Sequence, residues 1–271
     1  MDKNISYQSA KLLKAFNDKN QSFFNIEDVQ KILADTQNQS IRKLVSDMTK
    51  RGLIMRIKDG LYSIVPYENN NNYFPNWHIA AEKLSYPEKY YIGFYSALEI
   101  HGLVTQPSLT EYIVSNKQFI PKKQLIKNIK FEFVKYNETH FFGFEKTWIN
   151  NFEKVCCSDL EKTIIDCLYK PKYASGITEI IKSIDKGKDK IDVDKMMSYL
   201  EKFKADVVIK RIGYIMENFE SFGTIVKRFE NKISKSLSYL DPSYPKNGEY
   251  NNKWKIIDNV GVDEALNSLN T

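Results

Sequence analysis

Cysteine and histidine are scarce in this chain of 271 residues. It has three cysteines and three histidines, and the histidines lie far apart in the sequence. Two of the cysteines are adjacent, Cys156 and Cys157, and none forms a C-x-x-C pair with Cys167. The spacing therefore predicts neither a zinc site nor a disulfide framework. An odd, irregular set of cysteines favours a protein of a reducing compartment.

Long hydrophobic runs are absent as well. We find no stretch of about 18 apolar residues, the minimum for a transmembrane helix. The first four residues are followed by no apolar segment of the kind that a signal peptide carries. We therefore expect no membrane span, no signal peptide and a cytoplasmic location.

Common catalytic signatures are also missing: there is no G-x-S-x-G, H-E-x-x-H, Walker or G-x-G-x-x-G motif. Carboxylates cluster at Asp159, Glu161 and Asp166, without the P-D…E-x-K arrangement of metal-dependent nucleases. Ser158 and Glu161 fit instead the S-x-x-E capping box of a helix N-terminus. We expect no enzyme, and hence no catalytic residue, metal or cofactor. A nuclease or nucleotidyltransferase acting through this carboxylate cluster is kept as an alternative.

The chain has enough hydrophobic residues for a folded core, and it carries a net positive charge. Hydrophobic residues make up 42%, with 16 Phe and 17 Tyr, and the net charge is +6. Four consecutive asparagines at 69–72 favour turns and carry no periodicity. We place a linker at residues 67–73, between a domain at 1–66 and a larger domain at 74–271. The expected fold class is α+β.

The first domain has the pattern of three helices. Apolar positions predict helices at residues 7–16 and 26–33 and a third from Thr36 or Asn38 to Arg51. In the third helix the inward stripe consists of Ile41, Leu44, Val45 and Met48. Asn25 is expected as the N-cap of the second helix, and Gly52 as the stop signal of the third.

A β-hairpin follows these helices. Two short apolar runs, residues 53–57 and 61–65, flank an Asp59-Gly60 turn, which is a strong hairpin signal. Three helices and a hairpin are the layout of a winged helix-turn-helix, in which the third helix reads DNA and the hairpin is the wing. We therefore predict DNA binding by roughly residues 5–66 and a role as a transcriptional repressor.

The charge distribution supports this prediction. Between positions 36 and 58 there are six cations and one acid, Asp47, a net of +5 out of the whole-chain +6. Such a concentration is typical of a phosphate-binding surface. Polar side chains opposite the inward stripe can reach base edges, and we assign Arg56 and Lys58 to the wing. The predicted DNA-binding residues are Thr36, Asn38, Gln39, Arg42, Lys43, Ser46, Lys50, Arg51, Arg56 and Lys58.

The second domain reads as a mixed, helix-rich α/β unit. We expect a helix at 90–100 ended by Gly102, strands at 112–114, 131–136 and 141–149, and a late strand at 254–257. Further helices are predicted at 159–169, 177–184, 193–203, 207–219 and 222–237. Aromatic residues at 90–95 fit core packing, or a ligand cage, which would make the protein a ligand-responsive repressor. Basic clusters at 202–211 and 227–235 fit a solvated face, or an extension of a nucleic-acid surface.

Several segments carry a resemblance that spans nearly the whole chain. They are residues 50–62 (KRGLIMRIKDGLY), 95–103 (YSALEIHGL), 158–168 (SDLEKTIIDCL) with Pro171 and Tyr173 after it, 211–214 (RIGY), and the tail from Leu240-Asp241-Pro242 to Trp254. They resemble the AbiEi family, the antitoxins of type IV abortive-infection toxin–antitoxin systems used in phage defence. The block at 158–168 is the most specific. Relatives often carry Tyr-Ala-Gly-Gly where this chain has Tyr173-Ala174-Ser175-Gly176.

The resemblance implies two tasks. The first domain would bind inverted repeats in its own promoter and repress the operon, with self-association on the DNA. The second would counter a cognate nucleotidyltransferase-like toxin, AbiEii, without forming a stable complex with it. A ligand-responsive winged-helix repressor unrelated to any toxin is the alternative function.

Overall fold

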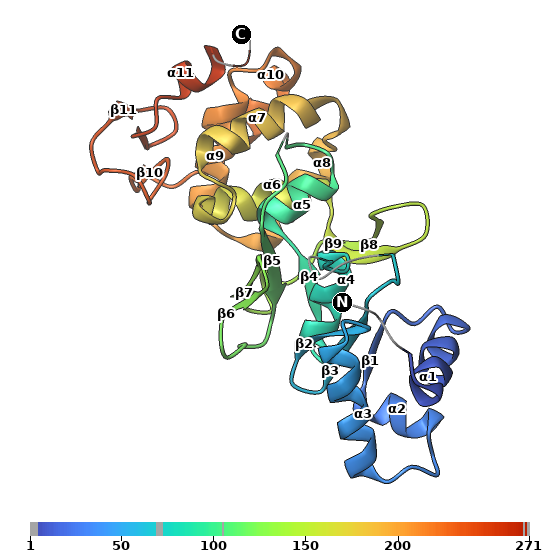
Figure 1. Cartoon of the computed structure of the whole chain (residues 1–271). Helices are drawn as coiled ribbons and strands as arrows, with labels where there is room; N and C mark the ends of the chain where they lie inside the picture. Colours follow the sequence, from blue (N-terminus) through green and yellow to red (C-terminus); the bar gives the residue numbers. More distant parts are fainter. Residues whose placement is uncertain (1–4, 69–72, 105, 268, 270–271) are drawn as a thin grey trace. The chain divides into compact units, whose positions relative to one another are not determined.

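The computed structural model has an α+β fold, as predicted, and describes residues 5–68, 73–104, 106–267 and 269 (Figure 1). The chain divides into two compact units, Met1–Tyr86 and Pro87–Thr271. The linker predicted at 67–73 lies earlier, and its four asparagines fall outside the described residues. None of the helices in the described part of the chain is both long and apolar enough to cross a membrane.

The division between the units falls after helix α4 (Trp77–Ser85), which the sequence analysis had assigned to the second domain. One contact ties this helix to the first unit: the Lys58 ammonium donates to the carbonyl of Leu84, at 3.2 Å. A hydrogen bond between residues 26 positions apart is not visible in a local sequence pattern.

The first unit contains the three predicted helices and the hairpin. The helices are α1 (Tyr7–Asn17), α2 (Ile26–Ile32) and α3 (Asn38–Lys50), and the hairpin is β2 (Ile54–Lys58) with β3 (Leu61–Ile64). A short strand that the sequence did not suggest, β1 (Phe23–Asn25), pairs antiparallel with β3 and completes a sheet of order β1-β3-β2. The core beneath it holds side chains from all three helices, among them Leu12, Phe16, Val29, Ile41, Val45 and Met48.

The predicted end signals of these helices are present. Asn25 accepts a hydrogen bond from the Asp28 amide at 2.8 Å, and the Asp28 carboxylate accepts one from the Asn25 amide at 3.0 Å. This reciprocal pair is a capping box that starts α2. Gly52 and Gly60 have φ values of +70° and +74°, which only glycine adopts without strain. They end α3 and form the hairpin turn.

The second unit is built on a mixed six-stranded sheet. Its order is β6-β7-β5-β4-β9-β8, with parallel pairing between β5 and β7 and between β4 and β9, and antiparallel pairing elsewhere. The strands are β4 (Tyr90–Ile92), β5 (Thr110–Ser115), β6 (Lys123–Ile126), β7 (Ile129–Lys135), β8 (Phe144–Trp148) and β9 (Lys154–Ser158). The predictions included β5, β7 and β8 but not β4, β6 and β9.

The predicted helix at 90–100 is wrong in its first part. Residues Tyr90–Ile92 form the central strand β4, and helix α5 covers only Phe94–Ile100. Tyr91 and Ile92 are fully buried, and a strand buried on both faces has no alternation that would distinguish it from a buried helix. Gly93 lies between the two elements. The position suits a glycine, because a Cβ there would lie 2.9 Å from the Val114 side chain.

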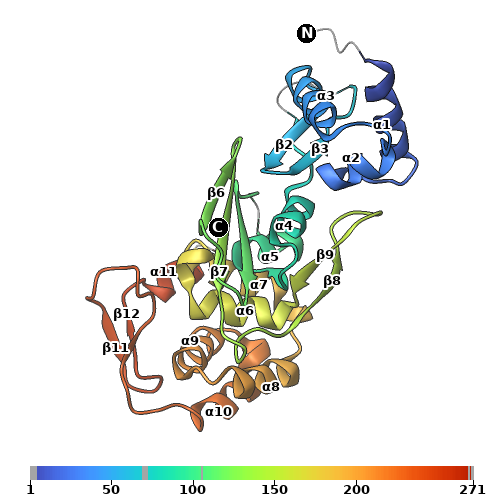
Figure 2. The ribbon, with the colours of Figure 1, turned by 90° about the horizontal axis from the view of Figure 1, so that it is seen from below.

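Helix α6 (Leu160–Tyr169) lies at the centre of the second unit, where it contacts α5, α7, α8 and α9 (Figure 2). The other elements are α7 (Ile177–Gly187), α8 (Val193–Phe203), α9 (Asp206–Met216), α10 (Gly223–Glu230), α11 (Val262–Asn267), and 3-10 turns at Pro171–Tyr173, Lys188–Lys190 and Glu220–Phe222. A small sheet joins β10 (Ser238–Tyr239), β12 (Ile256–Asp258) and β11 (Glu249–Asn251). The helix predicted at 222–237 thus ends seven residues early, at Glu230.

Candidate nucleic-acid interface

Helix α3 has one buried face and one exposed polar face. Ile41, Val45 and Met48 are at most 2% exposed and pack into the core of the first unit. Because the helix turns 100° per residue, the opposite face carries a row of polar and cationic side chains. All of them are exposed in the structure, and they are Gln39, Arg42, Lys43, Ser46 and Lys50. This face thus presents three cations and two hydrogen-bonding side chains to solvent.

A cleft of about 720 Å³ runs between α3 and the β2–β3 hairpin. Arg42, Ser46 and Lys50 line it from α3, and Arg56 lines it from β2, with the apolar surface of Ile26 and Tyr62 also in its wall. Cations therefore stand on both sides of one groove. An extended anionic chain would find positive charge on either side and an apolar surface between.

The remaining residues predicted on α3 lie at its two ends. Thr36 is in the turn before the helix, where its amide donates to the Leu33 carbonyl. Asn38 is the first helical residue, and its side chain accepts a hydrogen bond from Gln30 at 2.7 Å. Arg51 is the exposed C-cap. All three therefore lie at or beyond the ends of the helix and outside its central turns.

The β2–β3 hairpin carries an acid that the charge count left out. Arg56 forms an ion pair with Asp59, and the two side chains are 57% and 91% exposed. Asp59 also lines the cleft. It lies one residue beyond the window of 36–58, and including it lowers the local net charge from +5 to +4. An exposed pair of this kind contributes at most about 1 kcal/mol, so a phosphate can compete with Asp59 for Arg56.

Lys58 has a different environment from the other predicted cations. Its ammonium donates to the last turn of α4, at the Leu84 carbonyl, and burial lowers its pKa. Cations are favoured at helix C-termini, where the backbone carbonyls have no helical partners. Lys58 therefore holds the hairpin to α4 within the first unit, a role that the sequence did not reveal.

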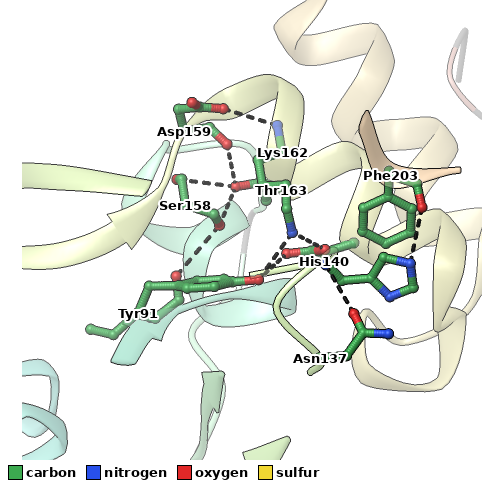
Figure 3. A network of polar contacts seen from close by, with 10 residues as sticks. Tyr91, Asn137, His140, Ser158, Asp159, Lys162, Thr163 and Phe203 are labelled. Carbon is green, nitrogen blue, oxygen red and sulfur yellow. Dashed lines mark hydrogen bonds and ion pairs between the residues drawn. The ribbon is translucent and has the colours of Figure 1, made fainter. Parts of the chain in front are cut away.

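A buried polar network surrounds Lys162 in the second unit (Figure 3). The Lys162 ammonium pairs with the Asp166 carboxylate, both side chains being fully buried. The Tyr91 hydroxyl donates to Asp166 at 2.8 Å and accepts from Lys162 at 3.0 Å. Burial lowers the pKa of Lys162 and raises that of Asp166, because the interior disfavours either charge.

Four aromatic rings surround the Lys162 ammonium. The rings of Tyr91, Tyr136, Phe142 and Phe203 have centroids 5.1–5.3 Å from it, within the range of cation–π attraction. His140 stacks on Phe203 at 4.0 Å, and burial lowers its pKa. The segment that resembles AbiEi most closely thus builds the interior of the second unit.

The three carboxylates considered as a catalytic cluster are not brought together. Asp166 faces Lys162, whereas Asp159 and Glu161 both pair with Lys195, at 3.2 and 2.8 Å. Asp159 also accepts a hydrogen bond from Tyr199 at 2.7 Å. Across the described residues, no group of three or more His, Cys, Asp or Glu side chains is arranged to hold a metal ion.

The predicted capping box at Ser158 and Glu161 is wrong. Asp159 is the N-cap of α6, since its carboxylate accepts from the Lys162 amide at 2.9 Å. Ser158 ends strand β9, and its hydroxyl contacts that of Thr163 at 2.7 Å. Glu161 accepts instead from the Asp192 amide at 2.9 Å. The helix begins one residue later than expected because the strand extends through Ser158.

Side chains from two other candidate sites of the second unit are also buried. The rings of Tyr91 and Phe94, in the segment considered as a ligand cage, are fully buried in the core. Lys210 and Arg211 belong to the first predicted basic cluster, yet they are 0% and 4% exposed. Arg211 donates to the carbonyls of Leu168 and Tyr239, and burial lowers its pKa to about 10. Lys202 and Lys204 of the same cluster are exposed, so the cluster is a solvated face only in part.

Comparison with known proteins gives a fold but no family. Neither a family model nor a curated protein matches the chain. Among solved structures it is similar to the RV2827C protein of Mycobacterium tuberculosis, with a TM-score of 0.74 and 11% sequence identity. The match covers 100% of this chain and 97% of that chain. At such low identity the similarity concerns the fold alone.

Proposed function

We propose that residues 5–66 form a winged helix-turn-helix that binds double-stranded DNA, and that the protein represses its own promoter. The observation that carries this proposal is the exposed row on α3, with Arg42, Lys43 and Lys50, beside a cleft that the hairpin closes with Arg56. The major groove of DNA admits an α-helix. The cations on both sides of the protein cleft can bind the phosphates of the DNA backbone.

The roles within this interface follow from side-chain chemistry. Gln39 and Ser46 have both donors and acceptors and can read base edges, with Gln39 suited to adenine. Lys43 and Arg42 can donate to guanine or to phosphate. Arg56 would exchange Asp59 for a phosphate at the wing. Lys58, bound to Leu84, would contribute to the position of the hairpin rather than to DNA contact.

We further propose that the second unit acts as a type IV antitoxin against a cognate nucleotidyltransferase-like toxin, without a stable complex. This proposal rests on the resemblance to AbiEi. The most specific segment, SDLEKTIIDCL, supplies strand β9 and helix α6, and its Lys162 and Asp166 are fully buried. This segment would therefore stabilise the fold of the unit, and other residues would form the surface that acts on the toxin.

A titration of the full-length protein against its own upstream DNA tests the repressor function. Binding should be sequence-selective, and the Arg42→Ala/Lys43→Ala variant should bind about 10- to 100-fold more weakly at 0.15 M salt. The slope of log K against log salt should fall by about 2, since each phosphate contact contributes about 0.9. Lys19→Ala, an exposed lysine after α1, is the matched control. Selective binding that survives in the double variant would refute the assignment of α3.

The antitoxin function is tested separately by co-expression with a neighbouring toxin gene. The wild-type protein should relieve growth arrest, and so should the Arg42→Ala/Lys43→Ala variant, because its second unit is intact. Growth arrest that neither protein relieves would contradict the antitoxin proposal and leave the repressor proposal standing.

A further inference from the structure

A second concentration of positive charge lies in the second unit, away from its buried network. The β6–β7 hairpin and the turn after α6 both carry lysines. From 117 to 135 the chain has six lysines and one acid, Glu132. Five lysines from these two segments lie close enough to interact, around Glu132 and the rings of Tyr136 and Tyr173. We call them the lysine cluster: Lys122, Lys123, Lys130, Lys170 and Lys172.

One buried carboxylate serves three members of the cluster. Glu132 is 5% exposed, and its oxygens lie 3.9, 3.6 and 3.1 Å from the ammonium groups of Lys122, Lys123 and Lys130. Those three lysine side chains are 46%, 59% and 38% exposed, so each also reaches solvent. A single negative charge cannot neutralise three positive ones.

Of the other two lysines, Lys172 contacts Tyr173 and Lys170 contacts Tyr136. Lys122 donates to the Tyr173 hydroxyl at 3.1 Å, and the Lys172 ammonium lies 4.8 Å from the centre of the same ring. Lys170 lies 4.6 Å from the ring centre of Tyr136. Within the described part of the chain, the ion pairs of this cluster all go to Glu132, and neither Lys170 nor Lys172 has one.

Five ammonium groups against one carboxylate leave an excess of four positive charges. The neighbouring charges affect Lys170, whose pKa is lowered to about 8. Burial lowers it most, the charge of Asp166 raises it, and the charges of Lys122 and Lys172 lower it further. Like charges held together without counter-ions destabilise the folded protein. A bound anion would reduce this repulsion, so anion binding at the cluster would be favourable.

We propose that the lysine cluster binds a compact ligand with several phosphate charges, such as the triphosphate of a nucleotide or inorganic polyphosphate. Lysine binds phosphate as a point charge with three donors. The charges gather around one carboxylate and the rings of Tyr136 and Tyr173, whereas the phosphates of a nucleic acid are spread along its axis. A compact ligand uses all five lysines at once. The proposal does not depend on DNA binding by the first unit.

Calorimetric titration of the full-length protein with sodium tripolyphosphate, and separately with ATP, tests the proposal. We expect one site per chain, with affinity that falls as salt rises. The Lys170→Gln/Lys172→Gln variant should bind at least tenfold more weakly. Lys235→Gln/Lys246→Gln, two exposed lysines elsewhere in the unit, and Arg42→Ala/Lys43→Ala should both bind like the wild type. Unchanged affinity in Lys170→Gln/Lys172→Gln would place the site elsewhere and overturn the proposal.

A parallel titration with duplex DNA of unrelated sequence distinguishes a compact polyphosphate ligand from a nucleic acid. If neither tripolyphosphate nor ATP binds, but the Lys170→Gln/Lys172→Gln variant loses affinity for that DNA, the cluster is a nucleic-acid surface and the compact-ligand proposal is refuted. Thermal unfolding of the variant serves as the fold control. Its midpoint should equal or exceed that of the wild type, because removing two like charges relieves repulsion.

Discussion

The two units each contain a group of cations that the sequence marked as a candidate surface or site, and the two groups differ in burial. In the first unit, Arg42, Lys43 and Lys50 stand exposed on one helix face. In the second, Lys162, Lys210 and Arg211 are at most 4% exposed, and each has its own partners inside the protein. Exposed charges cost little and stay available for a ligand, whereas a buried charge is tolerated only when it is paired. A cation count from sequence is therefore evidence of binding only after burial is known.

The largest expected effect comes from breaking the buried pair. Lys162→Met leaves Asp166 without its ammonium partner in the interior, and such a loss costs about 3–5 kcal/mol. Urea denaturation of the variant should show this decrease in the free energy of unfolding. The Lys162→Met/Asp166→Leu variant, which removes both charges, should recover most of it. A single variant within about 1 kcal/mol of the wild type would show that the pair is not what holds this core.

The next effect contrasts two lysines of the first unit. Lys50→Ala should weaken DNA binding and lower the salt slope by about 0.9, as expected for one phosphate contact. Lys58→Ala should leave the slope unchanged, since its ammonium is bound to the Leu84 carbonyl. The same anisotropy titration at several salt concentrations measures both. Equal losses in slope would mean that Lys58 leaves α4 when DNA binds.

A pH effect distinguishes the cluster of the second unit from ordinary surface lysines. The folded pKa of Lys170 is about 8, below its ordinary value of 10.5. Between those values the unfolded chain holds more protons than the folded one, so stability rises with pH in this window. Relative to Lys170→Gln, the wild type should gain stability from pH 8 to pH 10 in chemical denaturation. Parallel pH profiles would contradict the lowered pKa.

The smallest effect concerns the backbone conformation of Ser175. Ser175 is exposed and has a φ of +61°, a conformation that costs a non-glycine residue about 1 kcal/mol. Ser175→Gly should be neutral or stabilising by less than about 1 kcal/mol, because glycine removes strain but loses more backbone entropy. Ser175→Val should destabilise, since a β-branched side chain fits this region worst. Thermal unfolding should rank them glycine, serine, valine.

Local patterns in the sequence determined most of the first unit. The stripe of Ile41, Leu44, Val45 and Met48 predicted α3, although Leu44 is only partly buried. The glycines at 52 and 60 marked the end of this helix and the hairpin turn. Such features depend on residues only a few positions apart. The same reasoning predicted the α+β class and helix α8 to the residue. It missed β1 and β4, strands of three residues that exist only through their partners.

Only the tertiary structure decided which charged side chains are buried and which remain exposed to a ligand. Asp166 meets Tyr91 across 75 positions, Arg211 meets Leu168 across 43, and Lys58 meets Leu84 across 26. No pattern of period two or 3.6 records such contacts, and a lysine has the same propensities in a core as on a surface. Whether a charge is buried depends on what the rest of the chain packs around it. The sequence by itself therefore determined the helices, the hairpin and their polar face, and the folded chain determined which cations remain to bind a partner.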